Sequence, residues 1–324
     1  MAHAVRVYAY GGPDVLKYEA VTLADPGPGE AQIRQHAVGL NYIDVYLRTG
    51  LYPQPAMPFV PGMEGAGEVL KVGSGVSDLQ PGDKVAYAGP PGGYADARNI
   101  AADRLVKMPD GIDYKTAAAM MLQGMTTRYL LKKTFKVGPG TTMLWHAAAG
   151  GVGLMACQWA KHLGATIIGT VGTDDKMKLA KDAGATHVIN YRSENFVERV
   201  KEITGGKLCD VVYDSIGKDT FPASLDCIKP LGMWVSFGNA SGPVPPFNMA
   251  ILGQKGSLFA TRPSLGNYIA SKADLAETAN DLFDVVKRGI VKISVNQTYP
   301  LAEAVQAHRD LEGRKTTGST VLVP

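Results

Sequence analysis

The stretch from residue 142 to residue 171 constrains the fold of this 324-residue chain more than any other. An apolar run over 142–147 leads into a glycine-rich turn, HAAAGGVG, and then into a helical pattern over 151–163 that Gly164 ends. A second apolar run follows at 166–171. A strand, a glycine-rich turn, a helix and a second strand in this order predict a βαβ unit that binds a dinucleotide.

Strands and helices continue to alternate beyond this unit. Strands that alternate with helices of about ten residues form a parallel sheet covered on both faces. The sequence therefore predicts an α/β, doubly wound Rossmann domain over 125–262. Its further helices are expected at 175–183, 194–204 and 220–228, and its further strands at 187–190, 210–213, 233–237 and 256–260.

The residues before this domain follow a different pattern. Over 1–124, short apolar runs are separated by proline and glycine clusters, which predicts a compact β-rich domain with few helices. One helix is expected at 42–48, with Asn41 as its N-cap and Gly50 as its end.

The residues after the Rossmann domain change pattern again. Two amphipathic helices, at 272–288 and 301–311, precede a strand at 319–323. We interpret this tail as a return to the first domain, so that 1–124 and 263–324 form one discontinuous domain.

Each glycine of the turn has an expected task. Gly150 is predicted to permit the tight turn, while Gly151 and Gly153 let the backbone approach a phosphate and let the strand pack on the helix. The N-terminus of the helix offers N–H groups and the positive end of its dipole to a pyrophosphate. Ala148 replaces the first glycine of the usual GxGxxG pattern, so the assignment depends on the position of the turn between strand and helix.

The end of the second strand indicates which cofactor is bound. NAD-specific sites place an acid there to bind the ribose 2′-hydroxyl, but here Val171 is followed by Gly172 and Thr173. Lys176 lies just beyond, and a cation suits a 2′-phosphate because that dianion needs charge-assisted donors. NADPH is therefore expected rather than NADH, provided that the acids at 174 and 175 point to solvent.

Composition excludes several other classes of protein. The chain has 33 basic and 30 acidic residues and no basic cluster, which argues against a nucleic-acid partner. No apolar run of about 18 residues predicts a membrane span, and residues 1–16 contain no apolar signal core. Cys157, Cys209 and Cys227 are too far apart for a zinc or disulfide framework, so a reducing, cytoplasmic location is expected.

Several segments, in the same order along the chain, resemble the zinc-independent quinone oxidoreductase and zeta-crystallin branch of the medium-chain dehydrogenase/reductase family. They are GLNYIDVYLRTGLYP (39–53), VPGMEGAGEV (60–69), VGSGV (72–76), PGDKV (81–85), GTTMLWHAAAGGVGLMACQWAK (140–161), VVYDSIG (211–217), VSFGNASG (235–242) and TRPSL (261–265). The chain looks most like the bacterial NADPH:quinone reductases. The resemblance implies a Rossmann domain, a GroES-like catalytic domain and NADPH-dependent hydride transfer to quinones.

A metal ligand set is missing. Zinc alcohol dehydrogenases of the wider family use a Cys in the segment aligned with GLNYID and a His in a Gly-His-Glu motif. Here the first segment has no Cys, and the second reads Gly62-Met63-Glu64, with a thioether in place of the imidazole. No metal is therefore expected, and without a Lewis acid alcohol dehydrogenation is not expected either.

The resemblance also implies the site residues. Asn41 and Asp44 would lie near the nicotinamide ribose, although their spacing suits an N-cap and N3 pair equally well. The expected catalytic residues, some of which could equally be packing residues, are Asn41, Asp44, Tyr46, Tyr52, Gln123 and Arg262. The expected cofactor-binding residues are Asn41, Asp44, Thr126, Ala149, Gly150, Gly151, Val152, Gly153, Thr173, Lys176, Tyr191, Ser215, Phe237, Gly238 and Asn239.

Two other functions stay open at this point. The acceptor could be an α,β-unsaturated carbonyl, as in enone or enoyl reductases, or the chain could bind NADPH in a structural or RNA-binding role. A homodimer paired through the strand at 256–260 is expected by resemblance, unless Lys255 and Pro263 protect that edge in a monomer.

Overall fold

The computed structural model describes residues 2–324, which divide into two compact units. The first unit comprises 2–125, 269–287 and 293–324, and the second comprises 126–268 and 288–292. Each unit has its own sheet and its own apolar core.

The second unit is built on a parallel sheet of six strands, in the order β10-β9-β8-β11-β12-β13. The strands are β8 (Thr142–Trp145), β9 (Thr166–Val171), β10 (His187–Asn190), β11 (Cys209–Asp214), β12 (Ile228–Ser236) and β13 (Phe259–Thr261). Buried Leu144, Ile168 and Val212 form the centre of its core. Apolar strands of this kind are expected where helices cover both faces of a parallel sheet.

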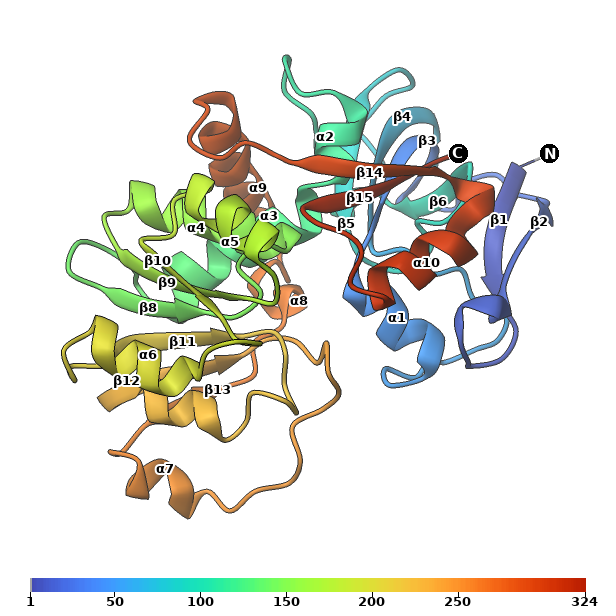
Figure 1. The fold of residues 1–324 in the computed structure, drawn as a ribbon. Coiled ribbons are helices and arrows are strands. Elements are labelled where there is room, and N and C mark those ends of the chain that lie inside the picture. The colour runs from blue at the N-terminus through green and yellow to red at the C-terminus, as the bar shows by residue number, and fades with distance from the viewer. Residues whose placement is uncertain (1) are drawn as a thin grey trace. The chain divides into compact units, whose positions relative to one another are not determined.

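Helices connect these strands, as Figure 1 shows, with α4 and α5 side by side next to β9. The helices of this unit are the C-terminal part of α3 (Met121–Tyr129), a π-helical turn η3 (Leu130–Thr134), α4 (Gly151–His162), α5 (Asp174–Asp182), α6 (Phe196–Ile203), a 3₁₀ turn η4 (Ala223–Cys227), α7 (Ala250–Gln254) and α8 (Leu265–Tyr268). The predicted Rossmann-type α/β fold is confirmed.

Two elements of this unit differ from prediction. The helix expected at 220–228 is only the 3₁₀ turn η4, because Pro222 has no N–H to donate and disfavours helical backbone in the residue before it. The strand expected at 256–260 starts only at Phe259. Gly256 and Ser257 have φ values of 114° and 55°, and this left-handed backbone cannot belong to a strand.

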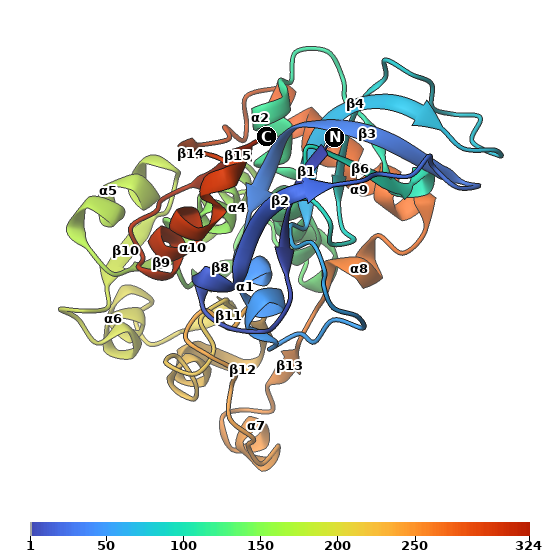
Figure 2. The same cartoon turned by 90° about the vertical axis from the view of Figure 1, so that its right-hand side faces the viewer.

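The first unit contains a seven-stranded sheet and a two-stranded hairpin. The larger sheet has the order β14-β15-β3-β4-β5-β7, with β6 paired to β3, and Figure 2 shows the long strands β3 and β4 side by side. The strands are β1 (Ala2–Val7), β2 (Leu16–Val21), β3 (Glu30–Leu40), β4 (Glu64–Val72), β5 (Lys84–Ala88), β6 (Ala97–Ala101), β7 (Val106–Lys107), β14 (Val295–Pro300) and β15 (Ser319–Val323).

The helices of the first unit are short except for one near the C-terminal part of the chain. They are η1 (Pro13–Val15), α1 (Tyr42–Thr49), η2 (Ala102–Arg104), α2 (Tyr114–Ala118), the N-terminal part of α3, α9 (Lys272–Lys287), η5 (Leu301–Glu303) and α10 (Ala304–Glu312). The prediction for α1 is confirmed: Asn41 is its N-cap, and Gly50, at φ 81°, ends it in a left-handed conformation.

Candidate functional site

The turn between β8 and α4 is held by close backbone packing. Its left-handed residue is Ala147, at φ 56°, so the prediction that Gly150 supplies the tight turn is wrong. Gly150 is instead the N-cap of α4, with ordinary extended backbone. Gly153 is required for packing, because a Cβ there would lie 2.4 Å from the Ala147 carbonyl oxygen.

The N-terminus of α4 has the chemistry of an anion site. The first N–H groups of a helix, here those of Gly151, Val152 and Gly153, have no acceptor within the helix. No side chain caps them, because the N-cap residue is Gly150. Their partial positive charge adds to the helix dipole, so this turn fits the pyrophosphate of a dinucleotide.

The carboxyl end of β9 carries the groups expected at the adenosine ribose. Thr173 caps α5 by accepting the N–H of Lys176, whose side chain is half-buried. Tyr191 covers Gly172, where a Cβ would lie 2.6 Å from the Tyr191 hydroxyl.

Two acids also lie near the end of β9. Both Asp174 and Asp175 are exposed, and the Asp174 carboxylate accepts a hydrogen bond from the Asn190 amide at 2.8 Å. The bond to Asn190 engages Asp174, and Thr173, Lys176 and Tyr191 supply the hydroxyl and ammonium groups that suit a 2′-phosphate.

Residues after β11 and β12 meet at the same edge of the sheet. The Phe237 N–H donates to the Asp214 carbonyl at 2.7 Å, and Phe237 also packs against Trp145 of β8. A Cβ on Gly238 would lie 2.5 Å from the Ser215 carbonyl oxygen, so these two loops are in direct backbone contact. Ligands bind at this carboxyl edge in doubly wound sheets.

The other predicted residues of the second unit lie beside this packing or in α3. Half-buried Asn239 accepts the N–H of Gly242 at 2.9 Å. Arg262 is exposed and donates to the Ser236 carbonyl at 2.8 Å, and Thr126 is half-buried in α3.

In the first unit, the N-terminus of α1 carries a buried polar cluster. The carboxylate of Asp44 accepts the Asn41 N–H at 2.9 Å and the Tyr94 hydroxyl at 3.1 Å. The Asn41 amide contacts the Glu64 carboxyl at 2.6 Å and the Gln123 amide at 2.9 Å. The structure therefore brings predicted Asn41, Asp44 and Gln123 together, around a residue that was not predicted, Glu64.

Burial shapes the acidity of this cluster. Asp44 and Glu64 have no exposed surface, and burial raises the pKa of Asp44 to about 7. Burial also raises the pKa of Glu64 to about 8, and the neighbouring Asp44 adds to the rise. A hydrogen bond from the Leu122 N–H opposes the change at Glu64.

A hydrogen-bond chain leads from Asp44 toward the surface. Arg48 donates to Nδ1 of His308 at 3.0 Å, so a neutral His308 carries its proton on Nε2, 3.1 Å from the Tyr94 hydroxyl oxygen. Arg48 also makes two 2.8 Å bonds to the partly exposed carboxylate of Glu312. Burial and the charge of Arg48 lower the pKa of His308 to about 3.

Tyr46 of α1 and Tyr52, which follows that helix, form an aromatic pair. Their rings are 5.3 Å apart in an edge-on arrangement, and the Tyr52 N–H donates to the Tyr46 carbonyl. Tyr46 is buried and Tyr52 is half-buried.

Comparisons with known proteins agree with this geometry. Residues 27–110 match the alcohol dehydrogenase GroES-like domain, and residues 151–283 match the zinc-binding dehydrogenase model. A quinone oxidoreductase of Pseudomonas aeruginosa is 54% identical over the full length of both chains. The chain belongs to the quinone oxidoreductase branch of the medium-chain dehydrogenase/reductase family.

Two solved relatives of this family extend the comparison. A quinone oxidoreductase from Escherichia coli, described as complexed with NADPH, is 51% identical and superposes with a TM-score of 0.98 over 99% of this chain and 100% of its own. A 2-haloacrylate reductase is 46% identical, with a TM-score of 0.88 over 99% of both chains. The curated 2-haloacrylate reductase of Burkholderia is likewise 46% identical over 100% of this chain and 99% of its own.

The zinc that the name of the second family model implies does not fit this member. The segment 39–44, which aligns with the segment of the zinc-binding Cys, contains no Cys, and the side chain of Asn41 within it is hydrogen-bonded to Glu64 and Gln123. Met63 offers a thioether where the zinc enzymes have an imidazole. Within residues 2–324 there is no group of three or more His, Cys, Asp or Glu side chains that could hold a metal ion.

Sequence reasoning missed four members of the polar cluster: Glu64, Tyr94, His308 and Ser319. Ser319 lies 2.9 Å from the Gln123 amide oxygen. Only Glu64 carried a signal, because it belongs to the Gly62-Met63-Glu64 segment that the resemblance singled out. The other three reach the cluster from distant parts of the chain.

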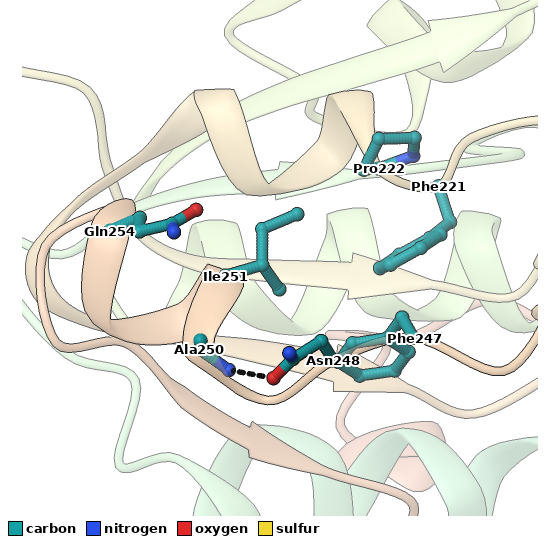
Figure 3. Close-up of a pocket in the computed structure, with 7 residues that line it drawn as sticks. All are labelled: Phe221, Pro222, Phe247, Asn248, Ala250, Ile251 and Gln254. Carbon is teal, nitrogen blue, oxygen red and sulfur yellow. Dashed lines mark hydrogen bonds between the residues drawn. The ribbon is translucent and has the colours of Figure 1, made fainter.

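A separate pocket lies in the second unit, beside α7 and η4 (Figure 3). Its volume is about 230 Å³, below the range of about 300–1,000 Å³ that is typical of ligand sites. The lining residues are Phe221, Pro222, Phe247, Asn248, Ala250, Ile251 and Gln254. None of them is a predicted site residue.

Proposed function

We propose that this protein reduces quinones by hydride transfer from NADPH, without zinc. The observation that carries the proposal is the match over nearly the whole chain to a quinone oxidoreductase described as complexed with NADPH, at 51% identity. In the balanced reaction, NADPH and one proton convert the quinone to a hydroquinone and leave NADP⁺. A quinone is electrophilic enough to accept hydride without a Lewis acid, so the protein has to position the two molecules and exclude water.

We propose that three groups of predicted residues hold the cofactor, and that the first two lie in the second unit. The N-terminus of α4, with the predicted residues Ala149 to Gly153, would hold the pyrophosphate. Thr173, Lys176 and Tyr191 would hold the 2′-phosphate. The remaining predicted contacts, to the nicotinamide half, are Asn41, Asp44, Thr126, Ser215, Phe237, Gly238 and Asn239.

For the catalytic set we propose a positioning task. Asn41 and Asp44 would orient the nicotinamide ribose, supported by their burial and by the bonds that hold them. Tyr46, Tyr52, Gln123 and Arg262 would shape the acceptor site. We also propose that 1–124 and 263–324 act as the catalytic domain and 125–262 as the NADPH-binding domain.

Absorbance of the reduced nicotinamide tests the main proposal. Purified, chelator-treated protein is mixed with NADPH or NADH, with and without a simple para-quinone. We expect NADPH consumption that requires the quinone, survives chelation and is much slower with NADH. Consumption that stops on chelation and returns with zinc would contradict the proposal, and so would NADPH binding without quinone reduction.

The 2-haloacrylate reductase relative supports a second candidate, reduction of an activated carbon–carbon double bond. A panel that includes an enone and a haloacrylate, assayed in the same way, separates the two. A kcat/KM at least tenfold higher for the unsaturated acid or ketone than for any quinone would favour the second candidate.

We further propose a homodimer paired through the edge strand β13. Two apolar side chains at this edge are strongly exposed: Phe259 of β13 at 58%, and Leu231, whose N–H donates to the Gly256 carbonyl, at 68%. An unpaired apolar edge strand is a ready template for a second copy. Lys255, which could have protected the edge, is engaged in an ion pair with Asp226.

Sedimentation velocity tests the dimer. We expect Phe259→Lys to sediment as a monomer, while the control Leu51→Lys, which changes an exposed apolar residue of the first unit, stays dimeric. A wild-type monomer at micromolar concentration would contradict the proposal.

We propose a cytoplasmic location, supported by three free and buried cysteines, which suit a reducing compartment. Nucleic acid is not a proposed partner, because the net charge is only +3. Among residues 2–324, no helix combines the length and apolar character that a membrane crossing needs.

A further inference from the structure

Ser319 exposes an inconsistency in the polar cluster. Its hydroxyl oxygen lies 3.0 Å from the Ala119 carbonyl oxygen and 2.9 Å from Oε1 of Gln123. Both partners are acceptors, whereas a hydroxyl has one hydrogen to donate. Turning the Gln123 amide over removes the conflict, because Ser319 then accepts from Nε2 and donates to Ala119. The oxygen and nitrogen of an amide are assigned from such networks.

Reversing the Gln123 amide also requires the Asn41 amide to reverse. The amides of Gln123 and Asn41 contact each other at 2.9 Å, so a Gln123 carbonyl facing Asn41 requires the Asn41 NH₂ to face Gln123. The Asn41 carbonyl oxygen then faces Glu64. Two oxygen atoms can form a hydrogen bond here only if Glu64 carries a proton and donates it.

The length of the Asn41–Glu64 contact agrees with this direction. The two side-chain atoms are 2.6 Å apart. Bonds of the N–H···O type range from about 2.7 to 3.2 Å, whereas O–H···O bonds range from about 2.5 to 3.0 Å. The Gln35 amide reaches the Gly93 carbonyl at the same 2.6 Å, so the length fits either direction and the contacts of Ser319 decide between them.

We propose that Glu64 is a neutral carboxylic acid that donates its proton to Asn41 and thereby sets the direction of the amide chain from Asn41 through Gln123 to Ser319. Glu64 is then a positioning residue that acts through Asn41. Its importance for catalysis rests on the proposed function, in which Asn41 contacts the nicotinamide half of NADPH, whereas its protonation does not.

The surroundings of Glu64 favour the neutral acid. A Cβ on Gly39 of β3 would lie 2.3 Å from its Oε1, so backbone closes over the carboxyl and excludes water. Its second oxygen accepts the Leu122 N–H at 2.7 Å. The titratable groups that face it are Asp44 of α1, Tyr87 of β5 and Tyr94, and Asp44 disfavours a second negative charge.

Ionisation of Glu64 would reverse the chain. An ionised carboxyl can only accept, so Asn41 would turn its NH₂ to Glu64 and its carbonyl oxygen to Gln123. The groups that Asn41 presents to a ligand then exchange places. Because the pKa of Glu64 is raised to about 8, this reversal belongs to mildly alkaline pH.

Infrared difference spectroscopy tests the protonation state directly. At pH 7, the wild-type spectrum should contain the carbonyl stretch of a protonated acid that Glu64→Gln lacks. This band should fade in the wild type as the pH rises through about 8. Glu68→Gln, a half-buried acid on the same strand, should lose only carboxylate bands. A Glu64→Gln difference that contains only carboxylate bands at pH 7 overturns the proposal.

Kinetics of the same variant test the positioning role. In Glu64→Gln the amide oxygen must accept the Leu122 N–H, so its NH₂ faces Asn41 and reproduces the neutral acid. We expect the kcat/KM of Glu64→Gln to stay constant between pH 7 and pH 9, whereas that of the wild type changes over this range as Glu64 ionises. A loss of tenfold or more at pH 7 in a folded variant would instead show that Glu64 works as an ionised acceptor.

Ser319→Ala gives an independent readout of direction. If Ser319 accepts a hydrogen bond from Gln123, removing its hydroxyl weakens the hydrogen-bond chain that accompanies the neutral form of Glu64. The infrared band of the protonated Glu64 should then disappear at a lower pH than in the wild type. A shift to higher pH would mean that Ser319 donates to Gln123 and overturns the proposal. Both infrared tests stand even if the wild type reduces no quinone, so the two proposals can fail separately.

Discussion

Individual side chains of the polar cluster are held by partners far away in the sequence. Asn41 is held by Glu64 and Gln123, and Asp44 is held by Tyr94. The effect of such buried groups on folding stability changes with pH in opposite directions for acids and for histidine. The raised pKa values of Asp44 and Glu64 make folding less favourable as the pH rises from about 4 to 8, whereas the lowered pKa of His308 acts at acidic pH.

His308 should make the protein acid-sensitive. Its folded pKa of about 3 lies below the ordinary value of about 6.5, so below pH 6.5 the unfolded chain binds a proton that the folded chain does not. This histidine then lowers the free energy of unfolding by about 2 kcal/mol at pH 5. We expect the stability difference between wild type and His308→Gln, measured in urea, to narrow by that amount between pH 8 and pH 5.

The matched control for this prediction is His187→Gln, which changes an exposed histidine. Its stability difference from wild type should be the same at both pH values. A constant difference for His308→Gln as well would mean that His308 is not held neutral.

Lys176 should discriminate between the two nicotinamide cofactors. Loss of one charge-assisted bond to a phosphate corresponds to about a tenfold change in affinity. We expect Lys176→Ala to raise KM for NADPH about tenfold and to leave KM for NADH unchanged, whereas Lys181→Ala in the last turn of the same helix should change neither. An equal rise of KM for NADPH and for NADH would show that Lys176 does not contact the 2′-phosphate.

At the scale of elements, the turn between β8 and α4 depends on one glycine. A side chain at Gly153 would overlap the Ala147 carbonyl, so we expect Gly153→Ala to lower the free energy of unfolding by about 1–3 kcal/mol. NADPH affinity, measured by fluorescence titration, should fall at least tenfold. Gly138→Ala, where a Cβ meets open space, is the control and should bind NADPH normally.

Elements with local signals could be predicted from the sequence. The helix α1 could be predicted from Asn41 at its start and Gly50 at its end. The βαβ series could be predicted from the alternation of apolar strand patterns with helical patterns. The turn η4 and the start of β13 could not be predicted, because Pro222 and the left-handed backbone at Ser257 override apolar patterns that otherwise read as a helix and a strand.

The candidate site could be predicted only in part. Asn41, Asp44 and Gln123 came from a resemblance between whole segments, and the structure brings them together. Glu64 and Ser319 complete the cluster only because β4 and β15 both lie next to β3. Such long-range partners leave no local pattern in a single sequence.

At the scale of the molecule, each unit has its own sheet and core, and all three tryptophans, Trp145, Trp159 and Trp234, lie in the second unit. Tryptophan emission therefore reports on that unit alone, whereas far-ultraviolet circular dichroism reports on both. Units with separate cores are expected to unfold in separate steps.

We expect Ile33→Ala, in the core of the first unit, to shift the circular dichroism transition in urea and to leave the tryptophan midpoint unchanged. Ile168→Ala, in the core of the second unit, should shift the tryptophan midpoint. Each change should lower the stability of its unit by about 2–5 kcal/mol. Equal shifts of both probes in Ile33→Ala would show a single cooperative transition.

The place of β15 between β14 and β3 has a consequence for the order in which the protein is made. Domains tend to fold during synthesis, from the N-terminus onward, at about 5–20 residues per second. The first unit leaves the ribosome early but lacks an interior strand of its sheet until Ser319–Val323 has been translated. The second unit, which is nearly continuous in the chain, can fold before it, so an exposed β3 edge must stay soluble throughout translation.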